Sequence, residues 1–147
     1  MDDNPSIMSH VSVGVADLER SAAFYDAVLG TLGARRVFDD GATIAYGRAF
    51  PEFGIGRPFD GGAPGVGNGT HFAFLARSRD EVDAFWAAAL AHGGRGDGGP
   101  GPRPDYEPGY YACFVRDPDG HKIEAHAMDE TPVEDGAGAE EAGAHPT

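Results

Sequence analysis

The sequence predicts an α+β fold in which two βαβββ modules form one cupped mixed β-sheet with helices on the outside. The first supporting observation is an internal repeat: a shift of 61 residues aligns His10 with His71 and residues 24–33 with residues 85–94, without a gap. The second is that each copy has a strand-like run, a helix-like run and then further strand-like runs. Neither copy is large enough to be a comfortable domain alone, so the two should share a core.

The first module is expected over residues 7–58. Alternation in residues 7–15 predicts a strand with its valines on one face and His10 on the other. Asp17 is a suitable N-cap for a helix that reaches about Leu29 and is followed by glycines. Three short strands should follow, at residues 34–38, 42–47 and 52–56.

A glycine-rich linker, residues 59–69, separates this module from the second, expected over residues 70–128. His71 begins a strand, and Ser78 with Glu81 has the spacing of a capping box at the start of a helix. After a long Gly/Pro-rich loop, strands are expected at 110–116 and 121–127, joined by an Asp-Pro-Asp-Gly turn at 117–120. We expect one domain over residues 7–128, a loose leader at 1–6 and an acidic disordered tail at 129–147.

Composition excludes several classes of function. The chain of 147 residues has a formal net charge of −13 and no basic patch, so nucleic acids and anionic membranes are poor partners. No apolar run approaches the length of a membrane-spanning helix, and the acidic N-terminus does not look like a signal peptide. A single cysteine, Cys113, excludes an internal disulfide and favours a cytoplasmic protein.

The alternation of strand residues predicts which side chains share the concave face. His10, His71 and Glu124 should point into one cleft from three strands, because the residues beside them are apolar and would pack under the helices. Two histidines and one carboxylate bind a divalent metal while leaving positions open for substrate oxygens. With an unbulged turn at 117–120, Cys113 would lie opposite Glu124 and Tyr111 opposite His126.

Three stretches of the chain resemble the vicinal oxygen chelate superfamily, which contains glyoxalase I, extradiol dioxygenases, fosfomycin-resistance enzymes and bleomycin-binding proteins. They are the run from His10 to Gly30, the segment Gly69-Thr70-His71-Phe72-Ala73-Phe74, and the ending Gly109-Tyr110-Tyr111 with Asp-Pro-Asp-Gly-His-Lys-Ile-Glu at 117–124. The last of these is the most specific. The resemblance covers roughly residues 7–128 and implies paired βαβββ modules around a divalent metal.

The resemblance also implies roles for individual residues. The metal positions of the family fall on His10, His71 and Glu124, and Glu124 would be the catalytic residue as well as a ligand. A fourth position, which in glyoxalase I is a carboxylate that also transfers protons, falls on Gly54. Glycine has no side chain to offer, and Glu52 would reach this position only with a shift of register. The remaining three ligands look more like the dioxygenase branch.

Other residues are candidates for contact with a substrate. The loop at 103–111 borders the expected cleft and is either a lid or an ordinary surface loop. Arg57 is a candidate for holding an anionic group, and Cys113 is by default a buried, inert thiol. The substrate-binding candidates are Tyr106, Tyr110, Tyr111, Cys113, His126 and Arg57.

Two functions remain open from the sequence. The first is a small metalloenzyme in which Fe, Mn, Ni or Zn binds a substrate through two neighbouring oxygen atoms. Ring-cleaving dioxygenation, isomerase or lyase chemistry, and thiol transfer all remain open. The second is a metal-free binding protein of the bleomycin-resistance type, whose acidic charge would favour a cationic ligand. The family resemblance implies a homodimer, and the sequence leaves open whether the modules pair within or between chains.

Overall fold

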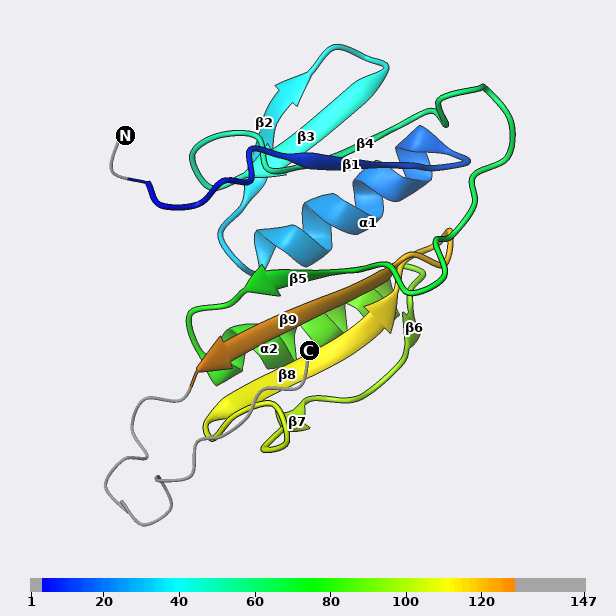
Figure 1. Cartoon of the computed structure of the whole chain (residues 1–147). Coiled ribbons are helices and arrows are strands. Elements are labelled where there is room, and N and C mark those ends of the chain that lie inside the picture. Colours follow the sequence, from blue (N-terminus) through cyan, green and yellow to red (C-terminus); the bar gives the residue numbers. More distant parts are fainter. Residues whose placement is uncertain (1–3, 129–147) are drawn as a thin grey trace.

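A computed structural model describes residues 4–128, in which the two predicted modules follow each other along the chain (Figure 1). The predicted tail at 129–147 and the first three residues of the predicted leader lie outside the described residues. Module one contains β1 (Val11–Gly14), α1 (Leu18–Gly30), β2 (Arg35–Asp39), β3 (Thr43–Gly47) and β4 (Phe53–Gly56). Module two contains β5 (His71–Leu75), α2 (Arg79–Ala91), β6 (Arg95–Gly96), β7 (Gly101–Pro102), β8 (Tyr110–Arg116) and β9 (Lys122–Met128).

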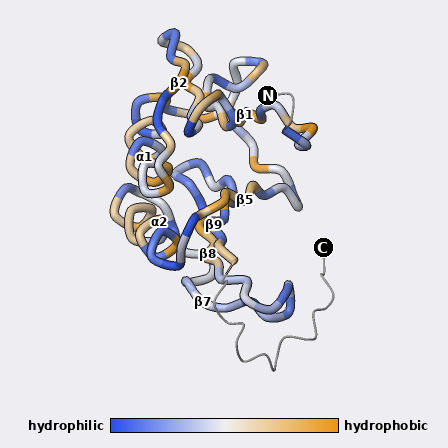
Figure 2. Tube along the Cα trace, turned by 90° about the vertical axis from the view of Figure 1, so that its left-hand side faces the viewer, coloured by the Kyte–Doolittle hydropathy of each residue, from blue (hydrophilic) through white to orange (hydrophobic). Residues whose placement is uncertain are grey.

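The strands form one hydrogen-bonded sheet in each module. Their order is β1-β4-β3-β2 in module one and β5-β9-β8-β6 in module two, where β7 also pairs with β8. Both α1 and α2 lie on the same side of the strands, which leaves the opposite side uncovered by helices (Figure 2). This arrangement confirms the predicted α+β class, the two modules and the outer helices. Within residues 4–128 the two sheets are not hydrogen-bonded to each other, and their edge strands β1 and β5 line opposite sides of a groove.

The two helices begin where their caps predict. Asp17 Oδ1 accepts a hydrogen bond from Arg20 N at 3.1 Å, and Ser78 Oγ accepts one from Glu81 N at 3.1 Å. Each cap satisfies a backbone donor that the first helical turn leaves free. The predicted linker at 59–69 contains no helix or strand, as expected.

An aromatic cluster joins the modules in the core. The ring of Phe53 on β4 lies 5.0 Å from that of Tyr25 on α1, and it also contacts Phe72 and Phe74 of β5 at 5.7 and 5.2 Å. Phe53 and Tyr25 are fully buried, so this cluster contributes both apolar burial and edge-to-face ring contacts. One continuous core therefore extends across both modules, as their small size requires.

The turn between β8 and β9 fastens module two to module one. Asp117 accepts a hydrogen bond from the Tyr25 hydroxyl at 2.6 Å, and both residues are buried. Asp119 accepts from Ala16 N at 3.1 Å and pairs with Arg20 at 3.1 Å, both at the start of α1. We call the turn at 117–121 the module clamp.

Module one makes a corresponding contact with module two through the turn between β3 and β4. Arg48 donates from Nε to the carbonyl oxygen of Leu32 at 2.7 Å and from Nη2 to that of Leu75 at 2.8 Å. Leu75 is the last residue of β5, so Arg48 of module one fixes the end of this strand of module two. The module clamp, in turn, fixes the start of α1 of module one.

The module clamp contains five residues instead of the predicted four. Arg116 pairs with Lys122, and Asp117 N donates to the carbonyl oxygen of His121 at 2.9 Å. Gly120 has φ of +99°, a conformation that favours glycine and accommodates the extra residue. The predicted pairs Cys113–Glu124 and Tyr111–His126 are therefore wrong by one position.

The first strand is shorter than predicted, and this changes the setting of His10. β1 pairs only with β4, which begins at Phe53 shortly after Pro51, a residue without a backbone N–H. The first ladder bond runs from Val11 N to the carbonyl oxygen of Glu52 at 3.0 Å. His10 consequently lies just outside the strand and is exposed.

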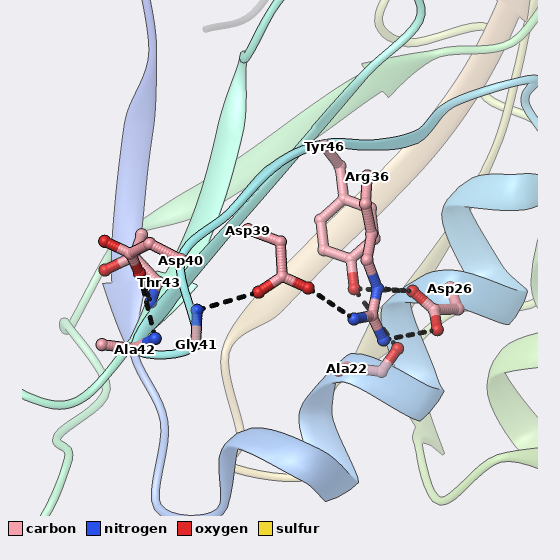
Figure 3. Close-up of polar contacts among 9 residues, drawn as sticks. All are labelled: Ala22, Asp26, Arg36, Asp39, Asp40, Gly41, Ala42, Thr43 and Tyr46. Atoms are coloured by element: carbon pink, nitrogen blue, oxygen red, sulfur yellow. Dashed lines mark hydrogen bonds and ion pairs between the residues drawn. The ribbon is translucent and has the colours of Figure 1, made fainter.

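Charged side chains attach α1 to the outer strands of module one (Figure 3). Asp26 on α1 accepts from Arg36 at 2.8 and 2.9 Å and from the Tyr46 hydroxyl at 2.9 Å. Arg36 also donates to Asp39 at 2.9 Å. In the β2–β3 turn, Asp40 Oδ1 accepts a hydrogen bond from the backbone nitrogen of Thr43 at 2.9 Å. The hydrogen bond from Arg36 lowers the pKa of Asp26, so this carboxyl stays ionised in mild acid.

We expect the protein to lose stability as the pH rises above about 10. Burial, followed by the charge of Asp117, raises the pKa of Tyr25 well above its usual value, and burial also raises that of Tyr46. In the unfolded chain tyrosine ionises near pH 10, so above that pH only unfolding allows these groups to release their protons. The melting temperature should begin to fall slightly above about pH 8.5, where the buried Cys113 thiol would ionise only on unfolding, and should fall more steeply between pH 10 and 11. The same fall in Tyr25→Phe would remove Tyr25 as its cause.

Candidate functional site

The concave face of module two brings a histidine and a carboxylate together. His71 at the start of β5 and Glu124 on β9 lie on the face opposite the buried Ile123 and Ala125. His71 Nε2 is 3.0 Å from Glu124 Oε1. Glu124 is only 1% exposed, whereas the His71 side chain is 45% exposed, so the pair presents the histidine to solvent and holds the carboxylate beneath.

Tyr110 holds the second oxygen of the same carboxylate. Its hydroxyl donates to Glu124 Oε2 at 2.6 Å, a length typical of a hydrogen bond to a charged acceptor. Burial and the neighbouring Glu124 raise the pKa of Tyr110, so the hydroxyl keeps its proton at neutral pH. A buried carboxylate is costly unless its oxygens are satisfied, and here Tyr110 and His71 satisfy both.

Aromatic rings form a wall beside this carboxylate. The ring of His126 is stacked on Tyr110 with centroids 4.3 Å apart and an angle of 7°, and Tyr106 lies 5.0 Å from Tyr110. Nδ1 of His126 is buried and has no hydrogen-bond partner among the described residues. Of the predicted substrate-binding residues, Tyr106, Tyr110 and His126 thus gather around Glu124.

Three other predicted site residues lie elsewhere. Tyr111 faces α2, where its hydroxyl donates to Asp83 at 2.7 Å. Cys113 is fully buried under α2, and burial raises the pKa of its thiol to about 12, as expected for an inert cysteine. Arg57 lines a different pocket, beside the start of α1. The five-residue turn explains the positions of Tyr111 and Cys113. It shifts the register so that Phe114 lies opposite Glu124, and Cys113 and Tyr111 then lie on the core face of β8.

His10 does not contact the His71–Glu124 pair. Its Nδ1 is hydrogen-bonded to the Ser9 hydroxyl at 2.9 Å, although His10 and His71 line the same groove between β1 and β5. Over residues 4–128 no group of three His, Cys, Asp or Glu side chains is placed to hold a metal ion. One chain therefore brings two of the three predicted ligands together.

A family model now identifies the fold in relation to known proteins. The model of the Glyoxalase/Bleomycin resistance protein/Dioxygenase superfamily matches residues 7–125. The chain belongs to this superfamily. A crystal structure of a glyoxalase/bleomycin resistance protein from Albidiferax ferrireducens T118 is 42% identical, with a TM-score of 0.75 over 84% of this chain and 99% of that one.

Two further known proteins are less similar in sequence. The fosfomycin resistance protein FosX from Listeria monocytogenes shares the fold, with a TM-score of 0.62 at 22% identity over 86% of this chain and 97% of that one. A protein of Brassica oleracea var. gemmifera named "Putative lactoylglutathione lyase" is 30% identical over 84% of this chain. The chain spans 45% of the length of that relative. No helix within residues 4–128 is long and apolar enough to cross a membrane.

The strand registers show how this superfamily member differs between its two modules. Ser12 pairs with Gly54 in module one as Ala73 pairs with Glu124 in module two. Gly54 is therefore the structural counterpart of Glu124, at the position that the family resemblance implies for the fourth ligand. Module one therefore has His10 at one of the two equivalent ligand positions and Gly54, which has no side chain, at the other. Module two has His71 and Glu124 at these positions.

Sequence reasoning placed Lys122 on the concave face correctly but missed two other residues there, Phe114 and Arg116. Phe114 lies opposite Glu124, and Lys122 lies between His71 on β5 and Arg116 on β8. A turn with Pro at its second position and Gly at its fourth is also compatible with a five-residue loop containing a bulge. That alternative register would have placed Phe114 and Arg116 on this face.

Proposed function

We propose that this protein is a divalent-metal-dependent enzyme that acts on a small molecule with two neighbouring oxygen atoms. The observation that carries this proposal is the 3.0 Å approach of His71 Nε2 to Glu124 Oε1 on the concave face of a superfamily fold. Imidazole and carboxylate are suitable donors for Fe, Mn, Ni or Zn. Both atoms belong to strands, which position them more rigidly than loops would.

The donors of one chain fit such an ion only in part. His71 and Glu124 supply two ligands, and His10 is held at a distance from them by the shortened β1. We expect His10 of a second copy to complete the set, so that a homodimer would contain two equivalent sites. Exposed apolar side chains along the groove between β1 and β5 support such pairing: Met8, Phe50 and Leu75 are 61%, 48% and 66% exposed.

The residues of this chain would then have distinct tasks. A bound ion would act as a Lewis acid on two adjacent substrate oxygens. Tyr110 fixes the Glu124 carboxylate through Oε2 and leaves Oε1 directed towards His71. The rings of Tyr106, Tyr110 and His126 would form the wall against which a substrate lies. Burial of Glu124 keeps competing water away from its oxygens.

The glycine at position 54 limits the classes of reaction that the proposed metal site would catalyse. Isomerase or lyase chemistry of the glyoxalase type uses a second carboxylate that transfers protons, and the structural counterpart of Glu124 in module one has no side chain. Dioxygenation or addition to an activated substrate requires only the three-ligand set. We therefore favour these two classes over a lactoylglutathione lyase activity, despite the name of the Brassica relative.

Metal content tests the proposal. Untagged wild-type protein reconstituted with Fe, Mn, Ni or Zn should bind one ion per chain by mass spectrometry, and Glu124→Gln should lose at least nine-tenths of it because the amide is a poor ligand. Glu19→Gln, a matched change on the exposed face of α1, should bind as wild type does. Equal metal content in wild type and Glu124→Gln would contradict the proposal.

A metal-free binding protein is the second candidate. It is favoured by the absence of a three-ligand group within residues 4–128 of one chain and by the aromatic wall beside Glu124. Stacked rings next to a buried carboxylate would suit a flat cation. Binding of an aromatic cation that is unchanged by a chelator, in protein that binds no metal after reconstitution, would establish this alternative.

A further inference from the structure

A second pocket adjoins the proposed metal pair at the start of β5 and β9. It has a volume of about 270 Å³ and is lined by the end of the linker, by His71, and by the side chains of Arg116 and Lys122. Figure 1 shows the linker returning to the start of β5, and the linker residues 66–70 line the pocket. Of the residues that line this pocket, only His71 takes part in the proposed metal chemistry.

The strand registers place its charged residues in one row. Lys122 pairs with His71 on one side and with Arg116 on the other, and residues directly opposite each other share a face of the sheet. Glu124 lies in the next row of the same face, two residues along β9, which corresponds to about 7 Å. The pocket and the carboxylate can therefore contact two parts of one small molecule.

The local charge of this row is opposite to that of the protein as a whole. Asp97 is 3.0 Å from Arg116 Nε and 3.8 Å from Lys122 Nζ, so one carboxylate faces two cations. The longer separation exceeds a hydrogen bond, and the Lys122 ammonium lies 5.3 Å above the Phe114 ring. The chain carries a formal charge of −13, which repels anions, so an anion bound here would owe its binding to these two side chains.

We propose that Arg116 and Lys122, with the Thr70 end of the linker, form a subsite for an oxyanion group of the substrate. The group is a carboxylate or a phosphate-like group that would lie beside His71 and about 7 Å along the strands from the atoms that approach Glu124. The inference rests on the proposed function for the role of that pair, and it narrows the substrate to a small organic acid. Arg116 already donates from Nε to Asp97 and from Nη1 to the carbonyl oxygen of Gly120, so among the described residues its Nη2 is the nitrogen left to donate to an oxyanion.

Anion titration of metal-free protein tests the subsite independently of the metal. In the presence of a chelator, inorganic phosphate should shift the backbone amide signals of Gly67, Gly69 and Thr70 in two-dimensional NMR. Lys122→Gln should weaken phosphate binding at least fivefold, and Asp97→Asn should strengthen it at least threefold by removing the competing charge. Arg35→Gln, on the exposed edge of module one, should leave binding unchanged.

The outcomes separate the two proposals. Phosphate binding that depends on Lys122 supports the subsite even if the protein binds no metal, and a parallel titration with acetate identifies whether phosphate or carboxylate is preferred. Equal binding by wild type and Lys122→Gln, with equal melting temperatures, would overturn the subsite. So would an Asp97→Asn variant that binds phosphate no more tightly than wild type. Neither result would affect the metal content of the protein.

Discussion

Replacing Asp117 with alanine should lower the free energy of unfolding by about 3 kcal/mol. The carboxylate is 2% exposed and accepts from the Tyr25 hydroxyl at 2.6 Å and from the backbone nitrogens of Asp119 and His121 at 2.9 Å each. Alanine leaves three donors without this acceptor, and a buried donor without a partner costs about 1–3 kcal/mol. The change also removes the contact between the module clamp and Tyr25 of α1, whereas the contacts of Asp119 with Ala16 and Arg20 remain.

Denaturant unfolding followed by circular dichroism measures this effect. A loss of 3 kcal/mol corresponds to a fall in melting temperature of about 10 °C for a chain of this size. Asp105→Ala is the matched control, because this aspartate is exposed in the loop before β8 and should change stability by less than about 0.5 kcal/mol. If the two variants unfold at the same denaturant concentration, the clamp does not hold the modules together.

Replacing Gly54 with glutamate should create a fourth metal ligand and raise metal affinity at least tenfold. Gly54 occupies in module one the position of Glu124 in module two. A Cβ atom there would meet its nearest neighbour, Ser12 Cβ, at 3.5 Å, which is an ordinary contact. Without metal the buried charge should destabilise the variant, and added metal should restore the loss, because binding to the folded state stabilises it.

Thermal unfolding with and without zinc or nickel measures both parts of this prediction. Gly54→Gln has nearly the same size without the charge, and it should show neither the destabilisation in chelator nor the larger gain with metal. A Gly54→Glu variant whose melting temperature responds to metal no more than that of Gly54→Gln would show that the two modules do not converge on one ion. This result would also argue against the contribution of His10 from a second copy.

The repeat made most of the fold predictable. One offset aligned the helices and the first strands, and the caps Asp17 and Ser78 fixed where the helices begin. Apolar alternation correctly placed His71 and Glu124 on one face. Phe72, next to His71, and Ile123, next to Glu124, point to the other face and pack into the core. These patterns repeat every two residues in a strand and every 3.6 residues in a helix, so they can be read from the sequence alone.

Register and strand length depended on contacts between distant segments. The extra residue in the clamp is set by hydrogen bonds that its aspartates make with Tyr25 and Ala16, about a hundred residues earlier. The start of β1 is set by β4, because an edge strand can extend no further than its partner. His10, Cys113 and Tyr111 were misplaced for these reasons, and no local pattern around them contained the information.

The module clamp has a consequence for synthesis on the ribosome. Module one is complete in sequence at Gly56, but the side chains that grip α1 come from residues 117–121. At about 5–20 residues per second, several seconds separate the two. During this interval Tyr25 lacks its acceptor and the faces of Phe53 that later meet β5 are uncovered. The nascent first half should therefore be the stage at which this chain most needs chaperones, and mutations in the clamp should reduce yield more than they reduce activity.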